Sequence, residues 1–399
     1  MSIERSLPEG SDEDEVQAPD VVDDDDTGRG ETGVKPWDPG KIRITTKNFS
    51  LRDVVDQIKD KEIDLSPDFQ RDYVWKQRQR TRLVESILLG IPLPAFYFNQ
   101  SNDGTYQVVD GVQRLSTISL FMKDGHVLDE SHLEYLRDLH GRVYTQLDPA
   151  ALRRFRSTQI VVHVIEPQTP DDVKYDIFNR VNTSGSPLSA QEIRHAMSKA
   201  RSRDFLKNLS EMKAFDEATN HHYWRRDADA EGGWIRDSGR MTNRELALRF
   251  CAFSDYSDED YRRHPSLDAF LVEYTRRLDR SSKDGDSIED TELHRLAADF
   301  DRAMENAHKV LGKAAFRRWP AGQARRGPIN RAVFESQAIA LSKYTLDQLM
   351  PRQSQIVNAF RGAFEDPVYA RTVTVSTGDP VAVESRLTLT KKILVSALA

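Results

Sequence analysis

The residues with the clearest chemical potential lie at a predicted turn between a strand and a helix. Residues 106–109 (YQVV) form a short, largely apolar run that predicts a buried strand. Asp110 and Gly111 interrupt this run, and apolar residues then recur at roughly helical spacing as far as Leu120. The segment VVDGVQRLSTISL, residues 108–120, therefore predicts a strand that turns sharply into a helix.

This turn provides the parts of an anion site. Gly111 allows the backbone to bend sharply or to approach a ligand closely. The amides of residues 112–114, which include Gln113, would begin the helix without intrahelical acceptors, at the positive end of its dipole. Arg114 adds a cation with a planar fork of donors. Together these features favour phosphate as the ligand.

Asp110 is the unexpected member of the turn, because a carboxylate repels a bare phosphate. We expect it to hold a metal ion, a sugar hydroxyl or the guanidinium of Arg114. A simpler interpretation of the whole stretch is an ordinary strand–turn–helix in which Arg114 makes a surface salt bridge. The residues alone leave both interpretations open.

Two further stretches carry polar residues suited to a ligand. Gln70 and Arg71 lie between Phe69 and the aromatic-rich residues 73–75, which would pin a loop while the polar pair points at a ligand. Residues 178–193 (FNRVNTSGSPLSAQEI) run from a predicted helix through a loop into a helix that starts with a capping box. Donors in that loop suit a polyphosphate or sugar, although a well-capped helix–loop–helix explains part of the pattern.

The remaining chain predicts a small mixed set of strands and helices followed by a helical half. A β-branched run at 158–166 predicts a strand, and its His163 is expected to be a packed or edge histidine rather than a metal ligand. Residues 371–384 are expected to be extended. Helices are predicted at 51–59, 171–181, 242–253, 266–280, 289–312, 329–347, 352–364 and from about 384 onward.

Composition indicates a cytosolic globular protein with an acidic leader. Residues 1–40 hold 13 acidic and 3 basic residues, so the other 359 residues carry a net charge of +3 although the whole chain carries −7. The single cysteine, Cys251, excludes internal disulfides and is expected to be buried and inert. No signal peptide or membrane span is evident. We expect a disordered tail over 1–40, a first domain over 41–200 and a helical domain over 201–399.

The basic pairs at 317–318 and at Arg325 and Arg326 form a local patch in the helical half. Such a patch is usually a solvated face. Contact with the phosphate backbone of DNA is the alternative, and the mildly basic charge of residues 41–399 permits it. The acidic leader has two interpretations as well, a solubilising tail or a mimic that occupies a basic groove.

Taken together, these stretches resemble a known family. The ordered series PDFQRDYVW, IPLPAFYF, VVDGVQRLSTI and FNRVNTSGSPLSAQEIRHA is similar to the domain-of-unknown-function 262 family. That family includes the N-terminal domains of GmrSD-type modification-dependent restriction enzymes and of the phosphorothioate-sensing protein SspE. The resemblance is specific over residues 45–200. It implies an α+β fold of the ParB/sulfiredoxin-like kind, a small mixed sheet with helices, followed here by an all-α region.

The resemblance also assigns a nucleotide site. The family's D-G-Q-Q-R pattern falls on residues 110–114, its Q-R pair on Gln70 and Arg71, and its F-x-R-x-N-T segment on residues 178–183, with Arg180, Asn182 and Thr183. This chain departs at Val112, where glutamine is usual. If that glutamine touches nucleotide or water, hydrolysis here is weakened, whereas nothing is lost if it faces the sheet.

The leading hypothesis is therefore a nucleotide-binding, NTP-hydrolysing module of a prokaryotic anti-phage or restriction system. Asp110, Gln113 and Arg114 would be catalytic, with Asp110 on Mg²⁺. Arg114 and the amides from Gly111 to Gln113 would also hold the phosphates, and the rest of the NTP site would consist of Arg180, Asn182 and Thr183. Gln70 and Arg71 would contact the nucleotide or a DNA backbone. DNA and a separate nuclease subunit are the expected partners, and no contact with a membrane is expected. Whether the chain forms homo-oligomers is left open. Two alternatives stand beside it: a DNA-binding or nicking protein without NTP turnover, and a scaffold that nucleotide switches without catalysis.

Overall fold

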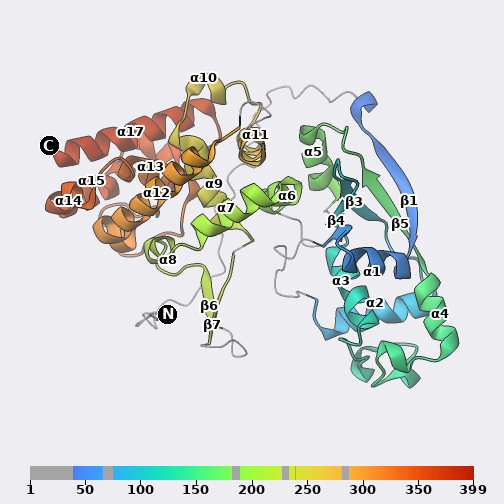
Figure 1. Ribbon diagram of the computed structural model, residues 1–399. Coiled ribbons are helices and arrows are strands. Elements are labelled where there is room, and N and C mark those ends of the chain that lie inside the picture. Colours follow the sequence, from blue (N-terminus) through green and yellow to red (C-terminus); the bar gives the residue numbers. More distant parts are fainter. Residues whose placement is uncertain (1–38, 66–74, 182–188, 227–232, 239, 281–286) are drawn as a thin grey trace.

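The computed structural model divides into two lobes, one built around a sheet and one built from helices (Figure 1). The sheet lobe comes first in the chain and the helical lobe second. The residues that the structure describes are 39–65, 75–181, 189–226, 233–238, 240–280 and 287–399.

A five-stranded mixed sheet organises the first lobe, with the order β1-β5-β3-β4-β2. β1 pairs antiparallel with β5, β5 pairs parallel with β3, β3 pairs antiparallel with β4, and β4 pairs parallel with β2. The predicted small mixed sheet is confirmed. The strands are β1 (Ile44–Ser50), β2 (Ile63–Asp64), β3 (Phe96–Gln100), β4 (Tyr106–Asp110) and β5 (Gln159–Ile165).

Alternation along the strands gives the sheet two apolar faces, and helices cover both. On β3 and β4, Phe96, Phe98 and Val108 face one cluster of buried residues, whereas Val109 belongs to a second cluster. The first cluster includes residues of α1 (Leu51–Lys59), α2 (Gln77–Leu89), α3 (Val112–Met122) and α4 (Pro149–Ser157). The second includes residues of α5 (Asp171–Val181) and α6 (Ala190–Met197).

The second lobe has its own large core, which runs from Leu206 to Leu394. None of the described helices combines the length and the apolar character that a membrane crossing requires. The elements are α7 (Ala200–Ser210), α8 (Lys213–Ala218), β6 (Trp224–Arg226), β7 (Trp234–Arg236), α9 (Thr242–Ser254), α10 (Asp258–Tyr261), α11 (Leu267–Asp279), α12 (Asp290–Asn306), α13 (Arg331–Leu341), α14 (Leu346–Leu349), α15 (Gln353–Gly362), α16 (Pro367–Thr372) and α17 (Pro380–Leu398).

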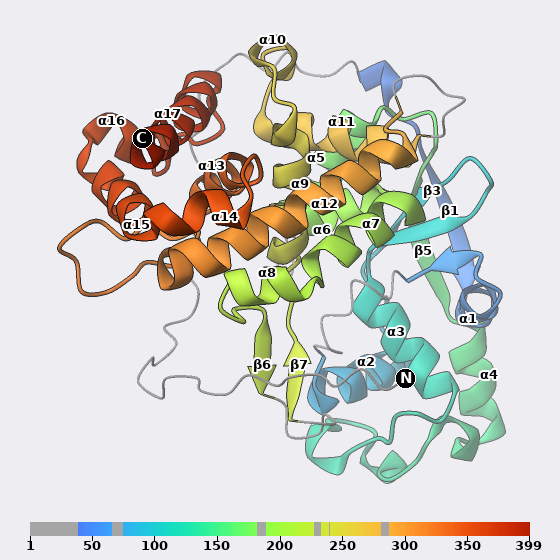
Figure 2. The same cartoon turned by 60° about the vertical axis from the view of Figure 1, so that its left-hand side comes forward.

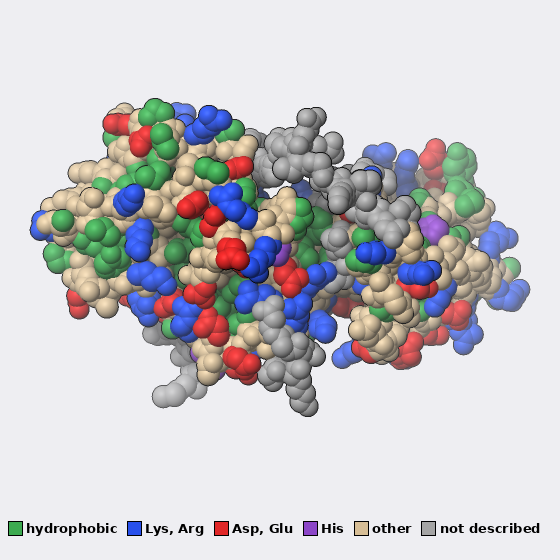
Figure 3. Space-filling model, turned by 90° about the horizontal axis from the view of Figure 1, so that it is seen from above, with side chains coloured by type: hydrophobic (Ala, Val, Ile, Leu, Met, Phe, Trp, Pro, Cys, Tyr) green, Lys and Arg blue, Asp and Glu red, His purple; other side chains and the backbone are tan. Residues whose placement is uncertain are grey.

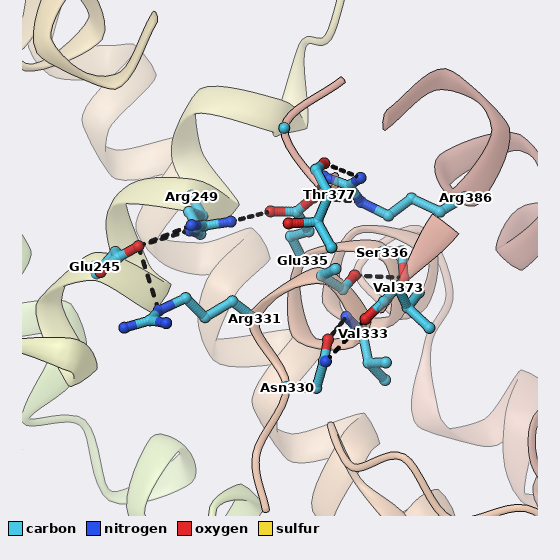
Figure 4. A network of polar contacts seen from close by, with 12 residues as sticks. Glu245, Arg249, Asn330, Arg331, Val333, Glu335, Ser336, Val373, Thr377 and Arg386 are labelled. Carbon is cyan, nitrogen blue, oxygen red and sulfur yellow. Dashed lines mark hydrogen bonds and ion pairs between the residues drawn. The ribbon is translucent and has the colours of Figure 1, made fainter. Parts of the chain in front are cut away.

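A buried network of charges crosses the helical lobe (Figure 4). Glu335 on α13 accepts a hydrogen bond of 2.6 Å from Nε of Arg386 on α17 and one of 3.3 Å from Arg249 on α9. Arg249 also donates to Glu245, which pairs in turn with Arg331 at 3.3 Å. Each charge in the network therefore has an opposite partner, as a buried ion requires.

One expectation about the helical half was wrong, and one element in it was missed. Residues 371–384 are not extended, because α16 ends at Thr372 and α17 begins at Pro380. The carboxylate of Asp379 caps α17 by accepting from the amides of Val381 and Ala382, and proline is well placed in a first helical turn. The hairpin of β6 and β7 was not predicted at all.

The buried and inert environment expected for Cys251 is confirmed. The thiol is buried in α9, and burial raises its pKa above the ordinary value. His163 is half-buried on β5. Its Nδ1 lies 3.0 Å from Thr46 Oγ1, and its ring lies 5.0 Å from the ring of Tyr97.

Candidate anion site at the start of α3

The predicted strand–turn–helix is present as β4, Gly111 and α3. Gly111 is the N-cap of α3 with φ of 101°, in the left-handed region that favours glycine. A Cβ at this position would lie 2.2 Å from Cδ1 of Phe96, so the ring of β3 also requires glycine here. The turn is therefore fixed both by its backbone and by its packing.

Arg114 faces the protein rather than open solvent. Its Nη1 donates to the carbonyl of Pro94 at 2.5 Å, and its Nη2 donates to the carbonyl of Ala95 at 3.2 Å. The guanidinium also lies 4.1 Å from the centre of the Phe96 ring. These contacts join the start of α3 to the start of β3, so the structure gives Arg114 a positioning role.

Asp110 takes the last of its three expected partners, the guanidinium of Arg114. Oδ2 of Asp110 accepts from Nη2 of Arg114 at 2.8 Å, and the arginine side chain is only 12% exposed. Burial lowers the pKa of Arg114, and the neighbouring carboxylate opposes that shift. The pairing offsets the negative charge of Asp110, which would otherwise repel an anion at the turn.

The first turn of α3 retains the donors that the anion hypothesis requires. No side chain caps the helix, and Leu115 is the residue whose amide reaches the carbonyl of Gly111. Oε1 of Gln113 is buried and has no hydrogen-bond partner. A buried acceptor without a donor costs free energy, so a ligand hydroxyl or a water molecule would stabilise this position.

Val112, the one departure from the family pattern, packs against the core of the sheet lobe. Its side chain therefore faces apolar residues. Of the two alternatives for this position, the structure favours the one in which valine removes no contact with a ligand.

Residues 51–198 match the family model described as the GmrSD restriction endonuclease, N-terminal domain. This part of the chain is similar to the N-terminal domain of GmrSD-type restriction endonucleases. The match includes the sheet from β2 onward and ends within one residue of α6. It agrees with the resemblance that the sequence motifs indicated.

Comparison with solved structures gives a Pnob8-like ParB-N domain, aligned over 88% of this chain and 98% of its own length. The identity is 13% and the TM-score is 0.21, which is too low to establish a shared fold. A comparison with curated proteins finds no match. The fold assignment therefore does not depend on this comparison, because the strand pairing itself defines the mixed sheet.

Of the other residues predicted for the nucleotide site, the structure describes only Arg180. Arg180 lies near the end of α5 with its side chain 74% exposed, and it pairs with Asp176 at 3.7 Å. Four further predicted residues lie outside the described part of the chain, so the structure leaves their positions open: Gln70, Arg71, Asn182 and Thr183.

No cluster of three or more metal-ligating side chains occurs within the part of the chain that the structure describes. Asp110 is the carboxylate at the turn, and one of its oxygens is paired with Arg114. An ion there would therefore depend on the remaining oxygen and on a ligand's own phosphates. This is how Mg²⁺ is commonly held in nucleotide sites.

Sequence reasoning missed a second polar cluster, on α6 of the sheet lobe. Arg194 is fully buried and donates to Gln191 at 2.8 Å and to Asp268 of α11 at 2.5 Å. Nη1 of Arg244 lies 3.4 Å from Nδ1 of His195, so α9 also meets α6. The available signal was the sequence AQEIRHAM, which has too few apolar residues to bury a helix face without paired polar groups.

Proposed function

We propose that the GmrSD-type domain binds the phosphates of an NTP at the start of α3 and hydrolyses it, as a module of a prokaryotic restriction or anti-phage system that acts on or senses DNA. The family match supports the restriction context. The uncapped first turn of α3, with the unpartnered Oε1 of Gln113 beside it, supports the nucleotide site.

In this proposal the backbone does the binding. The amides at the start of α3 would hold phosphate oxygens, aided by the helix dipole. Arg114 would act through Asp110 and the carbonyls of Pro94 and Ala95, because those contacts set the angle at which α3 leaves the sheet. Oε1 of Gln113 would accept from a ribose hydroxyl or from the attacking water.

The other predicted residues would complete the pocket from neighbouring segments. Arg180, near the end of α5, would reach the outer phosphate, with Asn182 and Thr183 following it in the chain. Gln70 and Arg71 would contact nucleotide or a DNA backbone. The second carboxylate oxygen of Asp110 would ligate Mg²⁺ together with the phosphates of the nucleotide. The ion would neutralise part of the phosphate charge when bound.

Gln113→Glu tests this site without removing any structural contact. The change is isosteric, and a carboxylate in the first turn of a helix is compatible with the helix dipole. Its negative charge should weaken binding of a fluorescent ATP or GTP analogue at least tenfold and reduce phosphate release accordingly. Gln355→Glu, in the first turn of α15, is the matched control and should bind and hydrolyse as the unmodified chain does.

Retained nucleotide affinity in Gln113→Glu would remove the assigned site. Arg114→Ala and Arg114→Lys then separate positioning from chemistry. If Arg114 positions α3, Arg114→Ala should lower thermal stability as well as phosphate release. Arg114→Lys, which keeps the charge and loses the planar fork, should restore only part of either.

One observation favours a second candidate function, nucleotide binding without turnover. The guanidinium of Arg114 is committed to protein acceptors, so it is not positioned to stabilise the charge of a transferring phosphoryl group. Calorimetric binding of each NTP, combined with phosphate release no faster than in buffer, would support that candidate. Turnover that is lost in Gln113→Glu would support the first.

A further inference from the structure

The segment that joins α12 to α13 differs in charge from the rest of the chain. Residues 307–330 contain six lysines and arginines and no acidic residue. In contrast, Figure 3 shows basic and acidic side chains intermixed over the helical lobe seen from above. A basic segment without internal counter-charges is the electrostatic footprint of an anionic partner.

Backbone pairing brings the two arginine pairs of this segment together. Arg317 and Ile329 form an antiparallel bridge, and the amide of Gly327 donates to the carbonyl of Arg318 at 3.1 Å. The chain therefore doubles back, and Arg318 lies opposite Gly327, the residue directly after Arg325 and Arg326. A Cβ on Gly327 would lie 2.9 Å from the Arg318 carbonyl, so this close approach requires glycine.

Arg361 of α15 contacts the tip of the loop, residues 319–323. It donates to the carbonyls of Trp319, Pro320 and Gln323 at 3.3, 3.3 and 3.4 Å. Its guanidinium also lies 4.1 Å from the Trp319 ring. The loop consequently holds a fixed shape where it stands out between α12 and α13 (Figure 2).

Arg318 and Arg325 carry charges that no described acidic residue offsets. Both residues are exposed, and neither makes an ion pair within the described part of the chain. The arginines of the buried network behave differently, because each of them meets a carboxylate. The two loop arginines are therefore available to an external anion.

We propose that this arginine loop, residues 313–326, binds the phosphate backbone of duplex DNA. The planar fork of arginine matches phosphate oxygens, and contacts of this kind position a protein on DNA without reading its sequence. A membrane surface fits less well, because no exposed large hydrophobic residue lies within 307–330 to enter the lipid. The choice of DNA as the partner rests on the proposed restriction function.

The salt dependence of DNA binding by the full chain tests the proposal. A labelled 20-base-pair duplex would be titrated at several salt concentrations by fluorescence anisotropy. Arg318→Ala with Arg325→Ala should weaken binding several-fold at fixed salt. The slope of log K against log salt should become shallower by about 2, since each lost phosphate contact contributes about 0.9. The matched control is Arg137→Ala with Arg153→Ala, which removes two exposed arginines of the sheet lobe.

Three outcomes would overturn the proposal: an unchanged slope in the loop variant, an equal change in the control, or a loss of binding to phosphatidylserine vesicles with DNA binding intact. The nucleotide site is tested separately. Gln113→Glu should leave the DNA slope unchanged, and the loop variant should bind nucleotide normally. Failure of one proposal is therefore distinguishable from failure of the other.

Discussion

At residue 111, backbone and packing impose the same choice of glycine. Gly111→Ala would strain a backbone with φ of 101° and push a Cβ to 2.2 Å from Phe96. The left-handed conformation costs about 1–2 kcal/mol and overpacking about 1–3 kcal/mol, so the free energy of unfolding should fall by about 2–5 kcal/mol. Gly104→Ala, with φ of 89° and nothing within 4 Å, should lose only the first part. Equal losses in urea unfolding would contradict the packing argument.

At this scale the sequence predicted residue types better than partners. The order Asp110, Gly111, Arg114 was enough to predict the turn and to name the Asp110–Arg114 pair as one of three alternatives. It was not enough to predict the carbonyls of Pro94 and Ala95 as acceptors. These residues lie 20 and 19 positions away along the chain, and only the pairing of β3 with β4 brings them to Arg114.

Among the elements, those with a regular apolar period were predictable. Helices α9, α11 and α15 lie close to the predicted ranges. The error at 371–384 has a physical explanation, since residues 371–375 (RTVTV) and 381–383 (VAV) alternate like a strand, whereas the Asp379–Pro380 pair is a helix start. A capping signal of two residues decided the structure against an alternation of greater length.

Helix α6 links the two lobes, because its Arg194 pairs with acidic residues of α9 and α11, so a change there should destabilise both lobes. Arg194→Ala would leave Asp268 and the buried Glu245 without this partner, at 2.5 and 3.8 Å respectively. Asp268 is half-exposed and Glu245 keeps Arg249 and Arg331, so the cost comes mainly from the cavity that the fully buried arginine leaves and from its lost hydrogen bonds. Chemical denaturation should show a loss of about 2–5 kcal/mol. Arg180→Ala on the exposed side of α5 should change stability by less than about 0.5 kcal/mol. A loss as small as that in Arg194→Ala would show that α6 does not depend on its buried charge.

For the molecule as a whole, buried charge and buried neutral histidine should respond to acid in different pH ranges. Burial alone would raise the pKa of Glu245, but Arg331, Arg249 and Arg194 lower it to about 2. The stability that Glu245 contributes is therefore lost only below the ordinary glutamate pKa of about 4.3. Any earlier loss of stability must come from other groups.

Two buried histidines should produce that earlier loss. Burial, with the charge of Arg80, lowers the pKa of His126 to about 4, and burial, with Arg203 and Arg244, lowers that of His195 to about 2. Below a pH of about 6.5 both histidines therefore bind a proton in the unfolded chain, whereas in the folded protein they remain neutral until the pH is much lower.

Stability should accordingly fall between pH 6 and 5 by up to about 2.7 kcal/mol, at about 1.4 kcal/mol per histidine. His126→Gln with His195→Gln should flatten this slope in urea titrations made at each pH. His294→Gln, an exposed histidine of α12, should leave it unchanged. A steep slope that persists in the double variant would mean that acid acts first on some other part of the fold.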